Sequence, residues 1–245
     1  MQNQYGLDRR IPAEIRRVVR QRCGFGCVVC ASSVFDYEHF NPEFSRARHH
    51  LPAGITLLCP GCHAKKTRNL MSARRVREAN EAPAALNKRY AFSEIEGSPR
   101  RPFVRFAGMQ LRNCITPVQI AGFPVLRIED SEEPGGPYRL SASFFNKLGQ
   151  PSLFIRKNEW QILADTWDVE VVGSTVTVRQ GLGEIALKLM FVPGEGLHVE
   201  RLEMYCAGFR LSGNAGSFSV NPPGGGIWAF TGGLVDNCET GLALG

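Results

Sequence analysis

The chain has 245 residues, 43% of them hydrophobic, and a formal net charge of +6. This length allows one large domain or two smaller ones, and the composition is typical of a soluble protein with a packed core. The first residues contain no apolar signal core and no apolar run approaches the length of a membrane span, so we expect neither secretion nor a membrane partner.

The positive charge is concentrated in the first part of the chain. Residues 1–100 hold 17 Lys and Arg against 9 Asp and Glu, whereas residues 101–245 hold 12 against 14. Neutralisation of phosphates supplies much of the affinity of proteins for nucleic acids. The first 100 residues are therefore predicted to bind a polyphosphate, and the balance of charge in the remainder weighs mildly against DNA.

Residues 11–22 predict the first helix. Proline near its start fits a first-turn position, and apolar residues recur on one face: Ile11, Ile15, Val18 and Val19. Arginines occupy much of the remaining surface, and three of them are candidates for nucleic-acid binding: Arg16, Arg17 and Arg20. This surface either contacts a phosphate backbone or is simply solvated, and the sequence leaves both interpretations open.

Two Cys-x-x-Cys pairs follow, Cys27 with Cys30 and Cys59 with Cys62. Each pair forms a tight turn, and four thiolates complete a tetrahedral Zn²⁺ shell. A closed shell leaves no position for a substrate, so this zinc is predicted to be structural. The other cysteines are scattered and suit reduced thiols in a reducing compartment, with the cytoplasm as the expected location: Cys23, Cys114, Cys206 and Cys238.

Carboxylate and imidazole groups lie between and just after these pairs. Residues 34–40 predict a strand that carries Glu38 and His39, residues 55–58 predict a second strand, and His63 directly follows the last cysteine. Together they suit a hard divalent cation and a general base. Three further groups are interpreted as surface residues of the intervening loop, with a weaker claim on metal or phosphate: Glu43, His49 and His50.

A second basic surface is predicted on the helices that follow His63. The helical pattern starts at His63 and continues or restarts at residues 72–82. The turns directly after His63 carry three candidates for nucleic-acid binding: Lys65, Lys66 and Arg68. A helix N-terminus also favours a phosphate close to His63. Residues 96–102 then predict a linker.

Beyond residue 103 the apolar pattern changes to a period of two. Strands are predicted at 123–128, 138–145, 152–155, 167–172, 175–179, 185–192 and 197–205. The predicted fold class is α+β: a zinc-stapled domain, residues 1–100, followed by an all-β domain, residues 101–245. A sandwich is favoured over a barrel or solenoid. The Gly-rich residues 212–245 predict either a loop-rich edge or a poorly ordered end.

The stretch from about residue 10 to 75 resembles the HNH endonucleases of the four-cysteine kind, whose core is a ββα-metal motif. The resemblance implies that His39 is the general base and that Glu38 and His63 hold a catalytic divalent ion, either Mg²⁺ or else Mn²⁺ or Ni²⁺. It implies metal-dependent hydrolysis of DNA phosphodiester bonds, with phage defence as a family-level setting. The family's Asn, five residues before the third cysteine, is here replaced by Gly54.

Two other functions remain open at this stage. In one, the first domain is a non-catalytic, zinc-dependent nucleic-acid-binding module. In the other, the nuclease is an effector controlled by the β domain, which acts as a sensor, an oligomerisation module or a docking platform. DNA is the expected partner of the first domain, and the second leaves room for self-association or a protein partner.

Overall fold

The computed structural model describes residues 2–245 and is mixed α and β, with most of its strands in large sheets after an N-terminal region of helices. The chain forms two compact units. The first contains the described residues up to Ser93 together with Ile162–Asp168, and the second contains Glu94–Gln161 and Val169–Gly245. The first unit therefore includes a short segment from the region that the sequence placed in the β domain.

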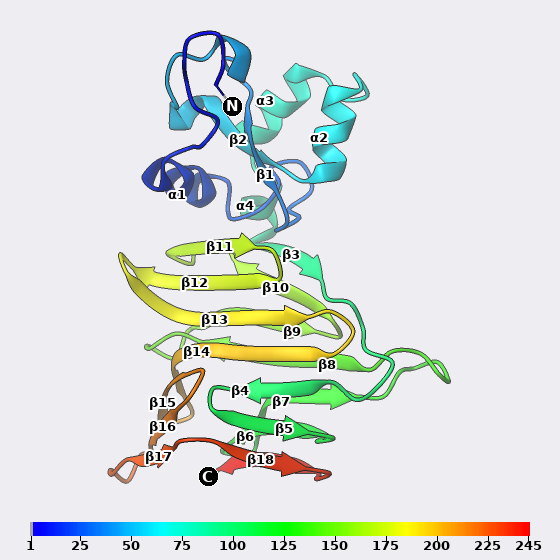
Figure 1. The fold of residues 1–245 in the computed structure, drawn as a ribbon, viewed down its shortest axis with the longest axis vertical. Coiled ribbons are helices and arrows are strands. Elements are labelled where there is room, and N and C mark those ends of the chain that lie inside the picture. The colour runs from blue at the N-terminus through cyan, green and yellow to red at the C-terminus, as the bar shows by residue number, and fades with distance from the viewer. Residues whose placement is uncertain (1) are drawn as a thin grey trace. The chain divides into compact units, whose positions relative to one another are not determined.

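The first unit is built mainly from short helices around a two-stranded sheet (Figure 1). Its helices are α1 (Ala13–Arg22), α2 (Pro60–Thr67), α3 (Ala73–Glu81) and α4 (Ala84–Lys88). Its 3-10 turns and strands are η1 (Phe44–Arg46), η2 (Pro52–Gly54), β1 (Asp36–His39), β2 (Ile55–Leu58) and most of β3 (Tyr90–Glu94). The helices and both strands predicted before residue 83 are thus confirmed, with shifts at their ends.

Local chemistry explains where α2 and α3 begin. The Sγ of Cys59 accepts a hydrogen bond from the backbone N–H of Cys62 at 3.3 Å, and Pro60 occupies the first turn, where its missing N–H costs nothing. Ser72 caps α3, because its Oγ accepts a hydrogen bond from the N–H of Arg75 at 3.1 Å. A cysteine pair and a helix cap therefore share the same residues at the start of α2.

The core of the first unit is small. All four residues of β2 are buried, and they pack in a cluster with Val19 of α1 and Val76 of α3. The sequence placed Val18 on the same apolar face as Val19, but its side chain is 44% exposed. Cys27 and Cys62 belong to this cluster, so two of the four paired cysteines are also part of the core.

Two large sheets make up the second unit. Six strands follow the order β19-β6-β7-β8-β9-β10: β6 (Thr116–Ile120), β7 (Phe123–Glu129), β8 (Arg139–Phe145), β9 (Pro151–Arg156), β10 (Glu159–Leu163) and β19 (Thr240–Leu244). The other sheet runs β11-β12-β13-β14-β15-β16-β17: β11 (Asp168–Val172), β12 (Thr175–Gly181), β13 (Glu184–Val192), β14 (Gly196–Cys206), β15 (Phe209–Asn214), β16 (Phe218–Asn221) and β17 (Trp228–Phe230).

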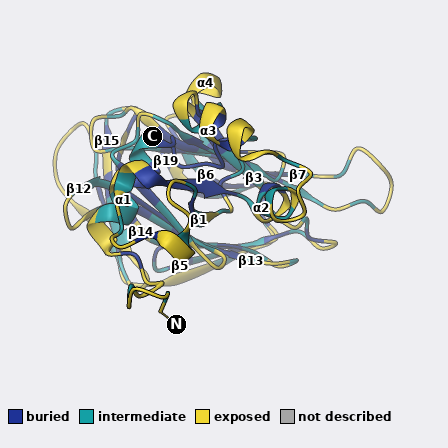
Figure 2. Cartoon of the chain, turned by 90° about the horizontal axis from the view of Figure 1, so that it is seen from above, coloured by how far each residue is buried: buried dark blue, intermediate teal, exposed yellow. Residues whose placement is uncertain are grey.

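The two sheets lie as layers, with β12 and β13 in front of β9 and β10 in Figure 1. Trp160 of β10 and Phe191 of β13 join them, their ring centroids 5.9 Å apart. Residues of β8 alternate between buried and half-buried, as expected for a strand with one face on a core. Figure 2 shows the strand interiors as buried and the connecting loops as exposed.

The long strand β14 is a branch point of its sheet. Its second half pairs antiparallel with β15, whereas Gly196–Val199 pairs in parallel with β4 (Phe103–Phe106). Strand β4 continues the branch to β5 (Met109–Arg112) and β18 (Gly233–Asp236). A Cβ on Gly196 would lie 1.9 Å from the carbonyl oxygen of Phe103, so this parallel pairing requires glycine.

All seven strands predicted after residue 103 are confirmed, but the sequence missed several others: β4, β5, β6, β10, β15 and those near the C-terminal end. Residues 212–245, expected as loops or a poorly ordered end, contain β16 to β19. No helix within residues 2–245 is long and apolar enough to cross a membrane.

Candidate functional site

The four cysteines predicted as zinc ligands come together in the first unit. The Sγ atoms of Cys27, Cys30, Cys59 and Cys62 all lie within 4.8 Å of one another. The Sγ of Cys30 is 3.6 Å from that of Cys59 and 4.0 Å from that of Cys62. A tetrahedral Zn²⁺ with Zn–S bonds of about 2.3 Å separates its sulfurs by about 3.8 Å. This group can therefore hold a metal such as zinc.

Two of these thiols have raised pKa values. Burial, followed by hydrogen bonding to Cys59, raises the pKa of Cys62 to about 12. A hydrogen bond to Cys27, together with burial, raises the pKa of Cys30. Clustered thiols resist ionisation because each thiolate repels the next, whereas zinc binds only thiolates. A divalent cation would supply the charge that this cluster needs in order to ionise.

The antiparallel pairing of β1 with β2 positions Glu38 and His39. Glu38 lies opposite Thr56 and His39 opposite Ile55, and neighbouring strand residues project to opposite faces. Glu38 reaches α2, whereas His39 reaches the loop that connects the two strands. The order strand, strand, helix thus presents a carboxylate and an imidazole from adjacent positions.

Glu38 meets two residues of α2. Its Oε2 is 3.1 Å from the Nε2 of His63, and its Oε1 pairs with the ammonium group of Lys66. The Glu38 side chain is 14% exposed, whereas that of His63 is 44% exposed. His63 and Lys66 project from the same side of α2 because residues three apart are neighbours on a helix. The structure therefore brings together Glu38 and His63, the two residues that the resemblance implied as ligands, and adds a lysine to them.

His39 is buried, with 8% of its surface exposed, and its Nε2 lies 3.1 Å from the Nδ1 of His50. Its ring also packs beside Phe44, with centroids 5.3 Å apart. Burial, together with the nearby His50, lowers the pKa of His39 below its ordinary value. His39 is therefore neutral at neutral pH, with one ring nitrogen engaged by His50.

Gly54 closes the loop between the two strands. A Cβ at this position would lie 2.1 Å from the backbone oxygen of Asn41. The carbonyl oxygen of Gly54 accepts hydrogen bonds from the N–H groups of Phe40 at 3.0 Å and Asn41 at 3.3 Å. No side chain fits here, which explains why glycine stands where the resemblance implied asparagine. The imidazole of His50, rather than a residue at position 54, contacts His39.

Two adjacent pockets open at Glu38 and His63. The larger, of about 850 Å³, is also lined by His39, Glu43 and Lys66; we call it the His39 pocket. The smaller, of about 610 Å³, is lined in addition by Asp36 and three arginines, Arg9, Arg10 and Arg16; we call it the Arg16 pocket. Both share Arg9 and Tyr37. The Glu38–His63 pair therefore forms part of a wall common to two pockets, of which the Arg16 pocket has more cationic than anionic side chains.

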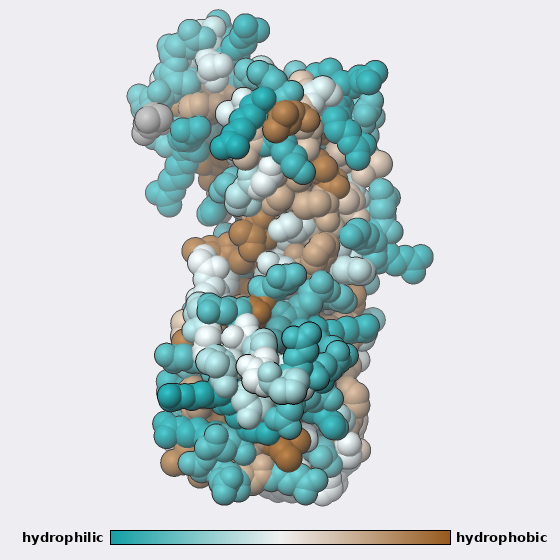
Figure 3. All heavy atoms as spheres, turned by 90° about the vertical axis from the view of Figure 1, so that its right-hand side faces the viewer, coloured by the Kyte–Doolittle hydropathy of each residue, from teal (hydrophilic) through white to brown (hydrophobic). Residues whose placement is uncertain are grey.

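The basic residues predicted to bind nucleic acid lie in different environments. Arg16 lines the Arg16 pocket, and the guanidinium of Arg17 lies 5.4 Å from the ring centroid of Trp167. Lys65 and Arg68 are exposed, and neither lines the two pockets. Lys66 lies inside the His39 pocket on Glu38. The upper part of Figure 3, which is the first unit, presents mostly hydrophilic side chains on the face shown.

The structure contradicts the prediction that Arg20 binds nucleic acid. Its Nε and Nη2 donate to the two carboxylate oxygens of Asp168 at 2.9 and 2.8 Å, and its Nη1 donates to the hydroxyl of Tyr37 at 2.8 Å. Burial opposes the charge of Arg20, but these partners raise its pKa. Both side chains are at most 5% exposed, so Arg20 cannot contact a phosphate backbone. Arg20 instead connects α1 with β1 through Tyr37 and with the segment Ile162–Asp168 through Asp168.

Sequence reasoning undervalued His50 and missed Arg9. Arg9 lines both pockets and packs on the ring of Phe44, 5.5 Å from its centroid. The N-terminal segment is held against the same loop, because the Nδ2 of Asn3 donates to the carbonyl oxygens of Phe44 at 2.6 Å and Ala47 at 2.7 Å. The only sequence signal was the Arg9-Arg10 pair before the first helix.

Comparison of the chain with protein-family models, with curated proteins and with solved structures finds no match.

Proposed function

We propose that this protein is a metal-dependent DNA endonuclease of the HNH kind and that its catalytic centre is the Glu38–His63 pair beside His39. The observation that carries the proposal is the 3.1 Å approach of Glu38 Oε2 and His63 Nε2 at the wall shared by two pockets, one of them rich in arginine. The strand, strand, helix order of β1, β2 and α2 beside the four cysteines supports the resemblance found in the sequence.

The donor set of Glu38 and His63 fits a divalent cation. Two ligands at about 2.1 Å from one ion, at a right angle, lie about 3 Å apart. A carboxylate suits Mg²⁺ or Mn²⁺, and an imidazole leaves room for Ni²⁺. When bound, the ion would supply charge stabilisation to the phosphate and to the departing oxygen.

His39 serves as the general base in this proposal. Its lowered pKa keeps the ring neutral, so that a lone pair can accept a proton from water. The competent tautomer has the His39 Nε2–H donating to Nδ1 of His50, because this arrangement leaves the other ring nitrogen of His39 without a proton. His50 is then a positioning residue that selects the tautomer.

The charges around the centre suit a DNA backbone. Arg9, Arg10 and Arg16 line the Arg16 pocket, and Lys66 lines the other side of the Glu38–His63 wall. Phosphate contacts of this kind orient the duplex without reading its sequence. We place phosphate binding on these four residues and on the exposed Lys65 and Arg68.

The test is relaxation of supercoiled plasmid by the zinc-loaded full chain, with Mg²⁺, Mn²⁺ or Ni²⁺ added after dialysis. We expect metal-dependent cleavage that falls about 10²–10⁴-fold in His39→Ala. Glu38→Gln should fall comparably, and His50→Ala by roughly 10–100-fold, as for other partners that orient a functional histidine. His49→Ala is the matched control, since His49 is an exposed neighbour of His50 outside both pockets.

Zinc content is measured for every variant, so that loss of the structural metal is separated from loss of catalysis. Cleavage that survives in both His39→Ala and Glu38→Gln would exclude this centre. Equal losses in His50→Ala and His49→Ala would exclude the positioning role of His50.

The ion pair between Lys66 and Glu38 favours one alternative. With its carboxylate held by an ammonium group, the first unit could act as a zinc-dependent nucleic-acid-binding module without catalysis. The plasmid assay separates the two proposals, because retention of DNA in a gel shift without cleavage in any metal would support the binding module.

For the second unit we propose a sandwich-like module that pairs with itself or with a protein partner. Its two layered sheets and its slightly acidic composition support this role over DNA binding. Light scattering of the full chain over a concentration series tests self-association. A mass that stays monomeric at every concentration would leave only the protein partner.

A further inference from the structure

The second unit contains two stacked copies of one short motif. Asn113-Cys114-Ile115-Thr116 runs from the end of β5 into β6, and Asn237-Cys238-Glu239-Thr240 runs from the end of β18 into β19. Strand β18 pairs in parallel with β5, and β19 with β6, at one constant register: Asp236 faces Arg112 and Thr240 faces Thr116. In Figure 1 the red β18 runs beside the green β5.

The corner between these strands keeps the same register. The N–H of Asn237 donates to the carbonyl oxygen of Arg112 at 3.1 Å, and the N–H of Ile115 donates to that of Cys238 at 3.2 Å. Asn113 and Asn237 both adopt positive φ, 50° and 56°, a conformation that asparagine tolerates. The two corners are therefore superposed, and equivalent side chains stand directly above each other.

This stacking brings two thiols together. The Sγ of Cys114 lies 3.0 Å from the Sγ of Cys238, and both cysteines are free. Adjacent strands are about 4.8 Å apart, which is within the Cα separation of about 4.4–6.8 Å that a disulfide requires. A bond could form with little movement of the backbone.

One of the two thiols is accessible from a pocket of about 770 Å³. Cys238 lines it and is only half-buried, whereas Cys114 is 1% exposed. Two cations, Arg100 and Arg101, line the same pocket together with one carboxylate, Glu239. The guanidinium of Arg101 is held over the ring of Tyr138, 4.9 Å from its centroid. Arg101 also pairs with the carboxylate of Asp130 at 3.1 Å, so we assign to Arg100 the attraction of a small anionic molecule toward Cys238.

We propose that Cys114 and Cys238 form a reversible disulfide by exchange with a small anionic disulfide that enters this pocket. The Cys238 thiolate attacks one sulfur of the reagent and expels the first small thiolate, which leaves a mixed disulfide on Cys238. Cys114 then loses its proton to water and attacks Cys238 Sγ, expelling the second thiolate. The two protein thiols are oxidised by two electrons, and the reagent is reduced to two thiols.

The roles of the two cysteines follow from their surroundings. Burial, followed by hydrogen bonding to Cys238, raises the pKa of Cys114 to about 12, so Cys114 is a poor initial nucleophile. Once Cys238 carries the mixed disulfide, Cys114 needs no diffusion to reach it. The bond would fasten β18 and β19 to β5 and β6 and close a loop of more than half the chain.

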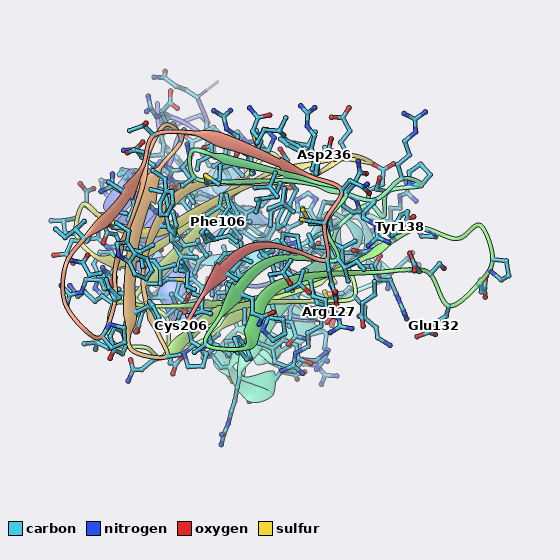
Figure 4. The ribbon with its side chains drawn as sticks, turned by 90° about the horizontal axis from the view of Figure 1, so that it is seen from below. Phe106, Arg127, Glu132, Tyr138, Cys206 and Asp236 are labelled. Carbon is cyan, nitrogen blue, oxygen red and sulfur yellow. The ribbon has the colours of Figure 1, made fainter. Side chains whose placement is uncertain are left out.

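Oxidised glutathione is the probe. The reduced, zinc-loaded full chain is equilibrated with graded ratios of oxidised to reduced glutathione, quenched with acid, alkylated, and mapped as peptides without reduction. We expect a Cys114–Cys238 linked peptide pair that is absent in Cys114→Ser and Cys238→Ser but present in Cys206→Ser. Cys206 is a matched control: a buried thiol of β14 that lies well apart from Asp236 in Figure 4. The oxidised wild type should melt about 5–10 °C above the reduced form, and the serine variants should show no gain.

Arg100→Ala tests the pocket. The rate of exchange should fall several-fold with oxidised glutathione and stay unchanged with the uncharged bis(2-hydroxyethyl) disulfide. The proposal is overturned if both cysteines remain alkylated at the most oxidising ratio, or if each ends as a stable glutathione adduct without a link. An equal rate for Arg100→Ala and wild type with both reagents would overturn the role of the cationic pocket. The wild-type map decides the main point even if a serine variant fails to fold.

Discussion

Each of the two units of this protein is stabilised internally in a different way. In the first unit a small cluster of buried residues includes Cys27 and Cys62, so the core depends on the state of the cysteines. In the second unit long strands such as β13 and β14 pair along their length and bury every other side chain. The first unit combines this cluster with a buried ion pair between Arg20 and Asp168, whereas the second has extensive strand pairing.

This difference predicts which changes destabilise each unit. A small core supplies little hydrophobic stabilisation, and a structural metal or a buried ion pair must supply the rest. A large sheet loses little when one polar contact is removed, but it tolerates no extra atom where two backbones approach closely. Four predictions test this comparison, in order of decreasing effect.

Removal of zinc should unfold the first unit and spare the second. Structural zinc contributes about 10–16 kcal/mol of apparent binding energy in small zinc domains, which exceeds the stability that this core can supply. Hydrogen exchange read by mass spectrometry should show protection lost in α1 and α2 after chelation and kept in β8 and β13. Added zinc should restore the protection. Unchanged exchange in α1 and α2 of a preparation shown to be zinc-free would contradict this dependence.

Asp168→Asn should destabilise the first unit by about 3–5 kcal/mol, because it leaves the buried Arg20 guanidinium without its counter-charge. Chemical denaturation followed by hydrogen exchange measures the loss and locates it. The paired replacement Arg20→Met with Asp168→Leu is the control and should recover much of the stability. A chain cut after residue 100 should show the same defect, because the cut removes Asp168. A cut chain as stable as the intact first unit would show that the pair is dispensable.

Gly196→Ala should destabilise the second unit by roughly 1–3 kcal/mol and leave the first unchanged. The new Cβ would meet the backbone of Phe103 and displace β4 from β14. Gly224→Ala is the matched control, since a Cβ there has no neighbour within 4 Å and its φ is not positive. Equal melting temperatures for the two variants would mean that β4 is not held closely.

Arg74→Ala should change stability by no more than about 0.5 kcal/mol. Its Nε lies 3.6 Å from Oε1 of Glu78, but both side chains are more than half exposed, and such pairs contribute little. If α3 contacts DNA, the slope of log affinity against log salt should fall by about 1 in the same variant. An unchanged slope would restrict DNA binding to the residues around the two pockets.

Local spacing determined much of the first unit. The period of apolar residues predicted α1 and β2, and the Cys-x-x-Cys pairs predicted a cluster that the structure forms within 4.8 Å. The pairing of Glu38 with His63 was implied only by the family resemblance, because a loop and a second strand separate the two residues in the chain. The alternation of residues after position 103 predicted seven strands for the same reason: a period of two is a local property of extended chain.

Tertiary structure alone decided the rest. Arg20 pairs with Asp168 across 148 residues, and Cys114 meets Cys238 across 124. His50 became the partner of His39 because Gly54 closes the loop between β1 and β2 against Asn41, and no period in the sequence encodes that closure. The sequence thus determined which helices and strands form and which cysteines lie in the same Cys-x-x-Cys pair, because both depend on residues that are neighbours in the chain. Tertiary packing decided which arginine is buried, which histidine contacts His39 and which thiols touch, because contacts that close long loops depend on where distant segments lie.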